Sequence, residues 1–122
     1  MPKRDIRMSD SEVDQFLRRE SRTVVIGSPQ TGAPRAGLGR LQYGDGHVGF
    51  SLREGDPLVT VLTENDRACC VVEEFPSYYE IMGVMLHGHA RRADREHAGE
   101  AIFELVVEKV VSFDFAKLLA TS

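Results

Sequence analysis

The chain has 122 residues, of which 42% are hydrophobic and 28% charged, a composition that is ordinary for a folded domain and excludes disorder along its whole length. Its net charge of −4, from 19 acidic and 15 basic residues, argues against non-specific electrostatic binding of nucleic acid. No apolar run reaches the roughly 18 residues that span a bilayer, and the first ten residues lack the apolar core of a signal peptide. We therefore expect one domain over residues 1–122, located in the cytoplasm, with neither nucleic acid nor a membrane as its partner.

The first predicted element is a helix that begins after Ser9. Ser9 and Glu12 have the spacing of a capping box, in which each side chain accepts a hydrogen bond from the other residue's backbone amide. Apolar residues follow at helical spacing, at Val13, Phe16 and Leu17. The pattern predicts a helix that ends near residue 20, with one face on a core.

Six short segments have strand-like patterns of β-branched or alternating apolar residues. They lie at residues 22–28, 35–43, 47–52, 68–72, 81–90 and 106–115. The connections at 29–34 and 44–46 have the Pro, Gly and Asp-Gly content of hairpin turns. Residues 58–62 fit a strand or a short helix, and the apolar spacing at 98–105 matches a short helix. This order predicts a mainly antiparallel sheet or barrel with an N-terminal helix and one short internal helix.

The two cysteines, Cys69 and Cys70, are adjacent in a predicted strand. A disulfide between neighbours is strained, and the chain has no Cys-x-x-Cys pattern for a redox or zinc site. We expect both to be reduced, buried strand residues.

Two histidines, His87 and His89, are two positions apart in another predicted strand, so their side chains should share a face. Such a pair can bind a metal or haem iron, with His97 as a third candidate ligand. The alternative is a pair of partly exposed strand histidines with no ligand, and the sequence leaves both interpretations open.

Several motifs in fixed order resemble one known family. They are a capped N-terminal helix, two hairpins, and strands that include a Tyr-rich motif and a terminal Ser-Phe-Asp-Phe-Ala-Lys-Leu, at residues 8–18, 22–34, 43–48, 62–74, 78–90 and 112–118. Together they resemble the pyridoxamine 5′-phosphate oxidase-like family of split β-barrels, over nearly the whole chain except residues 91–104, where this chain is shorter. The resemblance implies an antiparallel split β-barrel and a homodimer with two cofactor sites at its interface. It also implies FMN or a deazaflavin as the hydride carrier for a small-molecule substrate, with no catalytic side-chain nucleophile.

The resemblance places the cofactor phosphate at the end of the third strand and in the turn after it. The implied cofactor-binding positions are Arg40, Ser51, Leu52, Arg53, Asp56 and Leu58. Arg53 keeps the family's cation, and either Arg35 or Arg40 of the second predicted strand could compensate for lost contacts. Leu52 and Leu58 replace a hydroxyl and a lysine, and Asp56 adds a like charge beside a phosphate. Each lost contact should cost about 1–3 kcal/mol, so the two losses together should weaken binding by about two orders of magnitude or more.

These replacements leave two functions open. One is an oxidoreductase that binds FMN or a deazaflavin at a homodimer interface and transfers hydride to a small molecule. The other is a split-barrel homodimer that has lost the phosphate site and binds or transforms a small apolar ligand without flavin. The apolar residues Leu52, Leu58, Phe113 and Phe115 favour the second, because they would suit a hydrophobic cleft.

Overall fold

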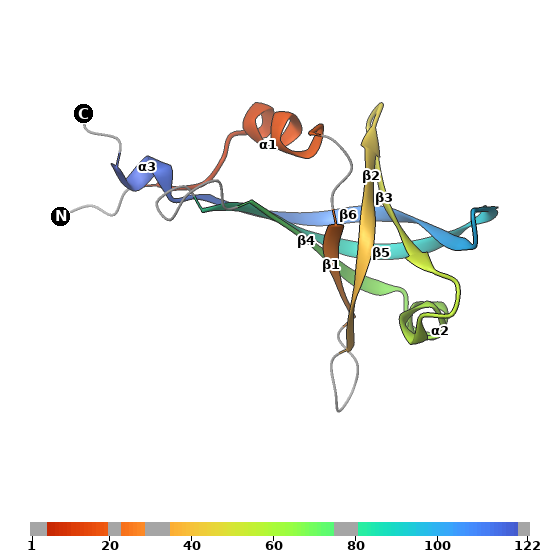
Figure 1. The fold of residues 1–122 in the computed structure, drawn as a ribbon. Helices are drawn as coiled ribbons and strands as arrows, with labels where there is room; N and C mark the ends of the chain where they lie inside the picture. Colours follow the sequence, from red (N-terminus) through yellow and green to blue (C-terminus); the bar gives the residue numbers. More distant parts are fainter. Residues whose placement is uncertain (1–4, 20–22, 29–34, 75–80, 120–122) are drawn as a thin grey trace.

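The computed structural model describes residues 5–19, 23–28, 35–74 and 81–119, and its main feature is a closed barrel of six strands (Figure 1). The strands are β1 (Thr23–Ser28), β2 (Arg35–Gly44), β3 (His47–Arg53), β4 (Arg67–Glu74), β5 (Met82–His97) and β6 (Glu100–Asp114). Their order around the barrel is β1-β2-β3-β6-β5-β4, and every pairing is antiparallel. The helices are α1 (Asp10–Leu17), α2 (Pro57–Glu64) and α3 (Ala116–Leu119). The predicted mainly β, antiparallel split-barrel class is confirmed.

All six predicted strands are present, but the last two are longer than predicted. Residues 98–105 do not form the expected internal helix. Ala98 and Gly99 have φ values of 52° and 77° and make the tight turn between β5 and β6, which begins at Glu100. Ala101, Phe103 and Leu105 then alternate toward the core as strand residues, so the period-two pattern of the sheet prevails over the helical spacing.

The internal helix is α2, at the segment whose sequence fits either a strand or a helix. Asp56 precedes it, and the Asp56 carboxylate accepts a hydrogen bond of 2.8 Å from the backbone N–H of Leu58. Pro57 occupies the first turn, where its missing N–H costs nothing. These two residues start a helix in a segment whose β-branched content alone does not distinguish a helix from a strand.

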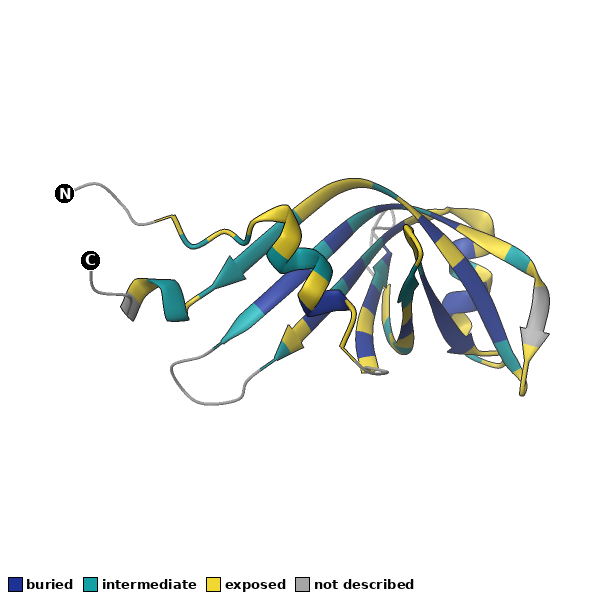
Figure 2. Ribbon diagram, turned by 90° about the horizontal axis from the view of Figure 1, so that it is seen from above, coloured by how far each residue is buried: buried dark blue, intermediate teal, exposed yellow. Residues whose placement is uncertain are grey.

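The core lies inside the barrel, and buried residues alternate with more exposed ones along β1 and β4; Figure 2 colours each residue by its burial. Phe50 and Phe103, on neighbouring strands, stack with their ring centroids 5.3 Å apart. The other fully buried side chains of the core are Ile26, Leu52, Leu62, Val24, Val72, Val84 and Cys70.

Helix α1 has the capping box that the sequence predicts. The backbone N–H of Glu12 donates to Ser9 Oγ at 3.2 Å, and the N–H of Ser9 donates to the Glu12 carboxylate at 2.9 Å. The helix ends at Leu17, earlier than predicted, and Phe16 and Leu17 are buried. Lys117 of α3 donates to Glu12 at 2.8 Å, so the two terminal helices lie together, whereas α2 lies at the opposite end of the molecule (Figures 1 and 2).

An ion-paired histidine links β5 and β6 to the residue that precedes β4. Nδ1 of His89 lies 2.9 Å from the Asp66 carboxylate, and Nε2 contacts the carboxylate of Glu108. The hydrogen bond to Asp66, followed by the charges of Asp66 and Glu108, raises the pKa of His89 above its ordinary value.

The raised pKa of His89 predicts how stability depends on pH. A group whose pKa is higher in the folded state stabilises that state below its unfolded pKa, and the contribution is lost as pH rises through the folded value. We expect the difference in free energy of unfolding between the wild type and His89→Gln to be larger at about pH 6 than at about pH 9. Urea unfolding at both pH values measures it. A difference that grows toward alkaline pH would contradict this account.

Within the described ranges, no helix has the length and apolarity that crossing a membrane requires. The predicted connection at 29–34 and positions 78–80 of the Tyr-rich motif lie outside the described residues.

Candidate functional site

A depression on the outer wall of the barrel contains four of the six predicted cofactor-binding residues. We call it the β3 depression; its volume is about 650 Å³. Its lining comes from β1, β2, β3, β6 and the start of α2, namely Thr23, Leu38, Gly39, Arg40, Ser51, Arg53, Gly55, Asp56, Pro57 and Glu100. The structure therefore brings Arg40, Ser51, Arg53 and Asp56 together.

Strand register explains this convergence. Arg40 of β2 stands opposite Ser51 of β3, and Arg53 follows Ser51 by two residues on the same face. Leu52, between them, points into the barrel and is fully buried.

The structure does not bring Leu52 or Leu58 to this surface. Leu52 is 0% exposed and Leu58 is 2% exposed, and both belong to the hydrophobic core. Their side chains line no part of the β3 depression. Their apolar character is explained by core packing, so it does not indicate a hydrophobic ligand at this position.

The hydroxyl of Ser51 is an unusual feature of the depression. Ser51 is 2% exposed, and its Oγ has no hydrogen-bond partner in the structure. A buried hydroxyl without a partner costs about 1–3 kcal/mol, and such groups often mark a functional site.

The charges in the depression are two guanidinium groups and two carboxylates. Among the described residues, neither Arg40 nor Arg53 has an ion pair or a side-chain hydrogen bond, and both are exposed. Asp56 is directed to the α2 backbone as its N-cap, and Glu100 stands opposite Arg53 on β6. Two cations are therefore available to bind an anion. The carboxylate of Glu100 is the main negative charge that would repel that anion.

Asp56 should affect both the stability of α2 and the affinity of the depression for anions. Asn caps helices as well as Asp does, so Asp56→Asn should leave the free energy of unfolding within about 0.5 kcal/mol of the wild type. Asp56→Ala should lower it by about 1 kcal/mol. Both variants remove a negative charge, and both should bind FMN more tightly than the wild type. Weaker binding by Asp56→Asn would show that the carboxylate does not oppose the ligand.

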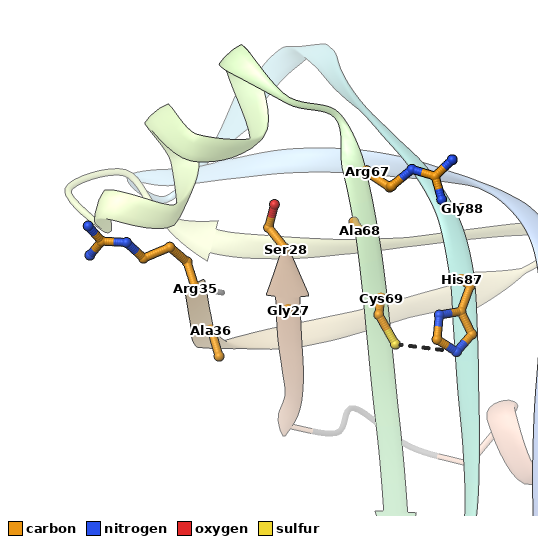
Figure 3. Close-up of a pocket in the computed structure, with 9 residues that line it drawn as sticks. All are labelled: Gly27, Ser28, Arg35, Ala36, Arg67, Ala68, Cys69, His87 and Gly88. Atoms are coloured by element: carbon orange, nitrogen blue, oxygen red, sulfur yellow. Dashed lines mark hydrogen bonds between the residues drawn. The ribbon is translucent and has the colours of Figure 1, made fainter. Parts of the chain in front are cut away.

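A second cleft, of about 440 Å³, opens on the wall formed by β1, β2, β4 and β5 (Figure 3). We call it the β4 cleft. Its lining residues are Gly27, Ser28, Arg35, Ala36, Arg67, Ala68, Cys69, His87 and Gly88. These residues could not be grouped from the sequence alone, because they lie on four strands whose pairing only the folded barrel defines.

The two cysteines have different environments. Neither is in a disulfide, and Cys70 is buried as predicted, where burial raises the pKa of its thiol to about 12. Cys69 faces the opposite side of β4 and is only half-buried, in the β4 cleft, so the prediction that it is a buried core residue is wrong. Adjacent strand residues point to opposite faces, and this rule alone separates the two.

The two candidate histidine ligands have different partners. Both ring nitrogens of His89 contact carboxylates, whereas His87 Nε2 lies 3.8 Å from Cys69 Sγ. In the part of the chain that the structure describes, no group of three His, Cys, Asp or Glu side chains is arranged to hold a metal ion.

Comparisons with known proteins show similarity in fold but not in sequence. No family model and no curated protein matches the chain. A conserved hypothetical protein from Mycobacterium tuberculosis has a TM-score of 0.79 at 17% identity, covering 100% of this chain and 94% of that one. An FAD-binding protein from Mycobacterium smegmatis has a TM-score of 0.73 at 15% identity, covering 90% and 99%. A candidate pyridoxamine 5′-phosphate oxidase from Corynebacterium glutamicum has a TM-score of 0.71 at 9% identity, covering 88% and 95%. The chain therefore has the split β-barrel fold of the pyridoxamine 5′-phosphate oxidase-like proteins, as its motifs predict.

Proposed function

We propose that the chain is an oxidoreductase that holds FMN or a deazaflavin by its phosphate in the β3 depression and transfers hydride to or from a small molecule. The observation that carries the proposal is that the guanidinium groups of Arg40 and Arg53 meet the hydroxyl of Ser51, and that none of the three has an ion pair or side-chain hydrogen bond within the described ranges. The fold similarity to an FAD-binding protein supports a flavin-type cofactor.

The donors in the β3 depression fit a phosphate. A guanidinium donates two parallel hydrogen bonds to phosphate oxygens, and a hydroxyl adds a third donor. Because Ser51 Oγ is buried, a phosphate reaches it only when neighbouring side chains move. The N-terminus of α2 opens on the same depression, but Asp56 already occupies one of its free amides.

In this proposal the side chains bind and orient the cofactor, and the bound cofactor supplies the hydride chemistry. Arg40 and Arg53 hold the phosphate, and Ser51 determines how deeply the phosphate enters the β3 depression. Leu38, which is 67% exposed at the edge of the depression, offers an apolar surface for a flat ring. This division of roles needs no nucleophilic side chain in the β3 depression.

We also propose that two copies of the chain associate through an apolar row beside the depression. Five strands contribute one residue each, in register, at Leu38, Val25, Val71, Met85 and Val111. Leu38 and Val25 are 67% and 43% exposed, and covering such a row removes apolar surface from water. Sedimentation equilibrium measures the association, and a monomer at micromolar concentration would refute it.

A second candidate function is the binding of a small apolar ligand without flavin. The observation that favours it is the β4 cleft, where small residues leave space at Gly27, Ala36, Ala68 and Gly88. Such a ligand would raise the thermal midpoint of the protein in the absence of any flavin.

The direct test of the cofactor proposal is a titration of the purified protein with FMN and with the deazaflavin coenzyme, followed by quenching of cofactor fluorescence. Micromolar or tighter binding by either cofactor supports the proposal. No binding of either would reject it and leave the apolar-ligand function.

A further inference from the structure

The β4 cleft contains a thiol and an imidazole in contact. Cys69 Sγ and His87 Nε2 are 3.8 Å apart, on β4 and β5, and the two residues are register partners (Figure 3). This is the separation of a sulfur–nitrogen hydrogen bond. A thiol beside an imidazole is the pairing that activates cysteine nucleophiles, with the imidazole as base.

The neighbouring residues leave the Cys69 thiol accessible. Gly27 is the register partner of Cys69 on β1, so no side chain covers the sulfur from that strand. Ala36 lies opposite Gly27 on β2, and it too is small. The volume of about 440 Å³ is within the range of small-molecule sites.

A second polar group in the cleft lacks a partner. Ser28 is 2% exposed, and among the described residues its Oγ has no hydrogen-bond partner. Figure 3 shows this hydroxyl directed away from Cys69 Sγ, because Ser28 and its neighbour Gly27, the register partner of Cys69, face opposite sides of β1. Among the described residues, the guanidinium groups of Arg35 and Arg67 also have no ion pair. The two guanidinium groups are donors suited to a carbonyl oxygen or an anionic oxygen, and they line the same cleft as the Cys69 nucleophile.

We propose that the β4 cleft is a covalent capture site for a small α,β-unsaturated carbonyl compound, with Cys69 as the nucleophile and His87 as the base. The Cys69 S–H bond breaks and its proton passes to His87 Nε2 as sulfur bonds to the β-carbon of the ligand. The C=C π electrons move to the α-carbon, which then takes the proton from His87. One S–C bond and one C–H bond replace the S–H bond and the C=C π bond, so no oxidant or reductant is needed.

Burial makes the base necessary. Partial burial raises the pKa of the Cys69 thiol above its ordinary value, so at neutral pH the sulfur is protonated and is a poor nucleophile by itself. A neighbouring base that accepts the proton typically accelerates such a reaction by 10²–10⁴-fold. The charged groups around the pair are Arg35 and Arg67 in the cleft, Lys109 opposite His87 on β6, and, two residues along β5, His89 with the carboxylates of Asp66 and Glu108.

The experiment uses N-ethylmaleimide, an α,β-unsaturated carbonyl compound, on the native full chain without flavin. Intact mass spectrometry follows the number of adducts, and peptide mapping assigns them. We expect one adduct, on Cys69, while Cys70 reacts only after unfolding because its side chain is 0% exposed. Cys70→Ala should react at the wild-type rate, and Cys69→Ser should not react in the native state.

The role of His87 is tested with His87→Gln. The rate constant at neutral pH should fall by about tenfold or more, and it should approach the wild-type value at alkaline pH, where the thiol ionises without a base. A purely structural role for His87 would not give this alkaline recovery. Reaction of Cys69 at an unchanged rate in His87→Gln, or equal reaction of Cys69 and Cys70 in the native protein, would overturn the proposal. Because no flavin is present, failure here is distinct from failure of the cofactor proposal.

Discussion

Replacement of Phe103 by alanine is expected to lower the free energy of unfolding by about 3–5 kcal/mol. Phe103 is 1% exposed and stacks on Phe50 across the pairing of β6 with β3. Truncation removes the buried ring, leaves a cavity that the rigid strands fill poorly, and ends the ring stacking. Urea unfolding, monitored by circular dichroism, gives the difference.

A matched control lies three residues further along the same strand. Val106 is 51% exposed, so Val106→Ala should cost less than about 1 kcal/mol. If the two variants lost similar stability, Phe103 would not be part of the barrel core. This comparison tests the inward and outward alternation of β6, on which the position of the β3 depression also depends.

The second large effect concerns the affinity for FMN. Arg53→Ala should weaken binding by about tenfold to a hundredfold, because a hydrogen bond to a charged group contributes about 1.5–3 kcal/mol. Arg53→Lys should recover part of the loss, since lysine keeps the charge but not the paired donors. Fluorescence titration measures all three proteins.

The control for Arg53 is Lys109→Ala, which removes the same charge from an exposed position on β6. Its affinity for FMN should stay close to the wild-type value. Equal weakening by Arg53→Ala and Lys109→Ala would mean that net charge, rather than contact in the β3 depression, governs binding.

The strands were predictable because their turn residues and alternating apolar patterns are those that the observed sheet requires. The Asp45-Gly46 turn has φ values of 52° and 76°, and it joins two strands with alternating apolar residues. The internal helix was harder to place, because Ala101 and Leu105 satisfy both a helical and an alternating pattern. Pairing on both sides selects the strand, with β5 through the adjacent hairpin turn and with β3 over a long distance in sequence.

The candidate site was predictable in part. Arg40, Ser51 and Arg53 meet because one hairpin fixes their register, and the hairpin is a local feature. Leu52 and Leu58 were grouped with them by resemblance, but one points into the barrel and the other packs from α2 into the core. A binding role can be assigned to a strand or helix residue only when it is known whether its side chain faces the core or the surface.

The β4 cleft could not be predicted, because it exists only where β1, β2, β4 and β5 close the barrel. Cys69 and His87 are separated by 18 positions in sequence and become neighbours through the pairing of β4 with β5. The sequence alone places both residues in strands and says nothing about the space left by Gly27.

Phosphate binding in the β3 depression is tested most directly by comparing FMN with riboflavin, which differs only in lacking that phosphate. We expect the wild-type protein to bind FMN at least about tenfold more tightly than riboflavin, and Arg53→Ala to reduce this preference. Equal affinity for the two compounds would contradict this expectation, because the contacts of Arg40, Ser51 and Arg53 would then contribute nothing to binding.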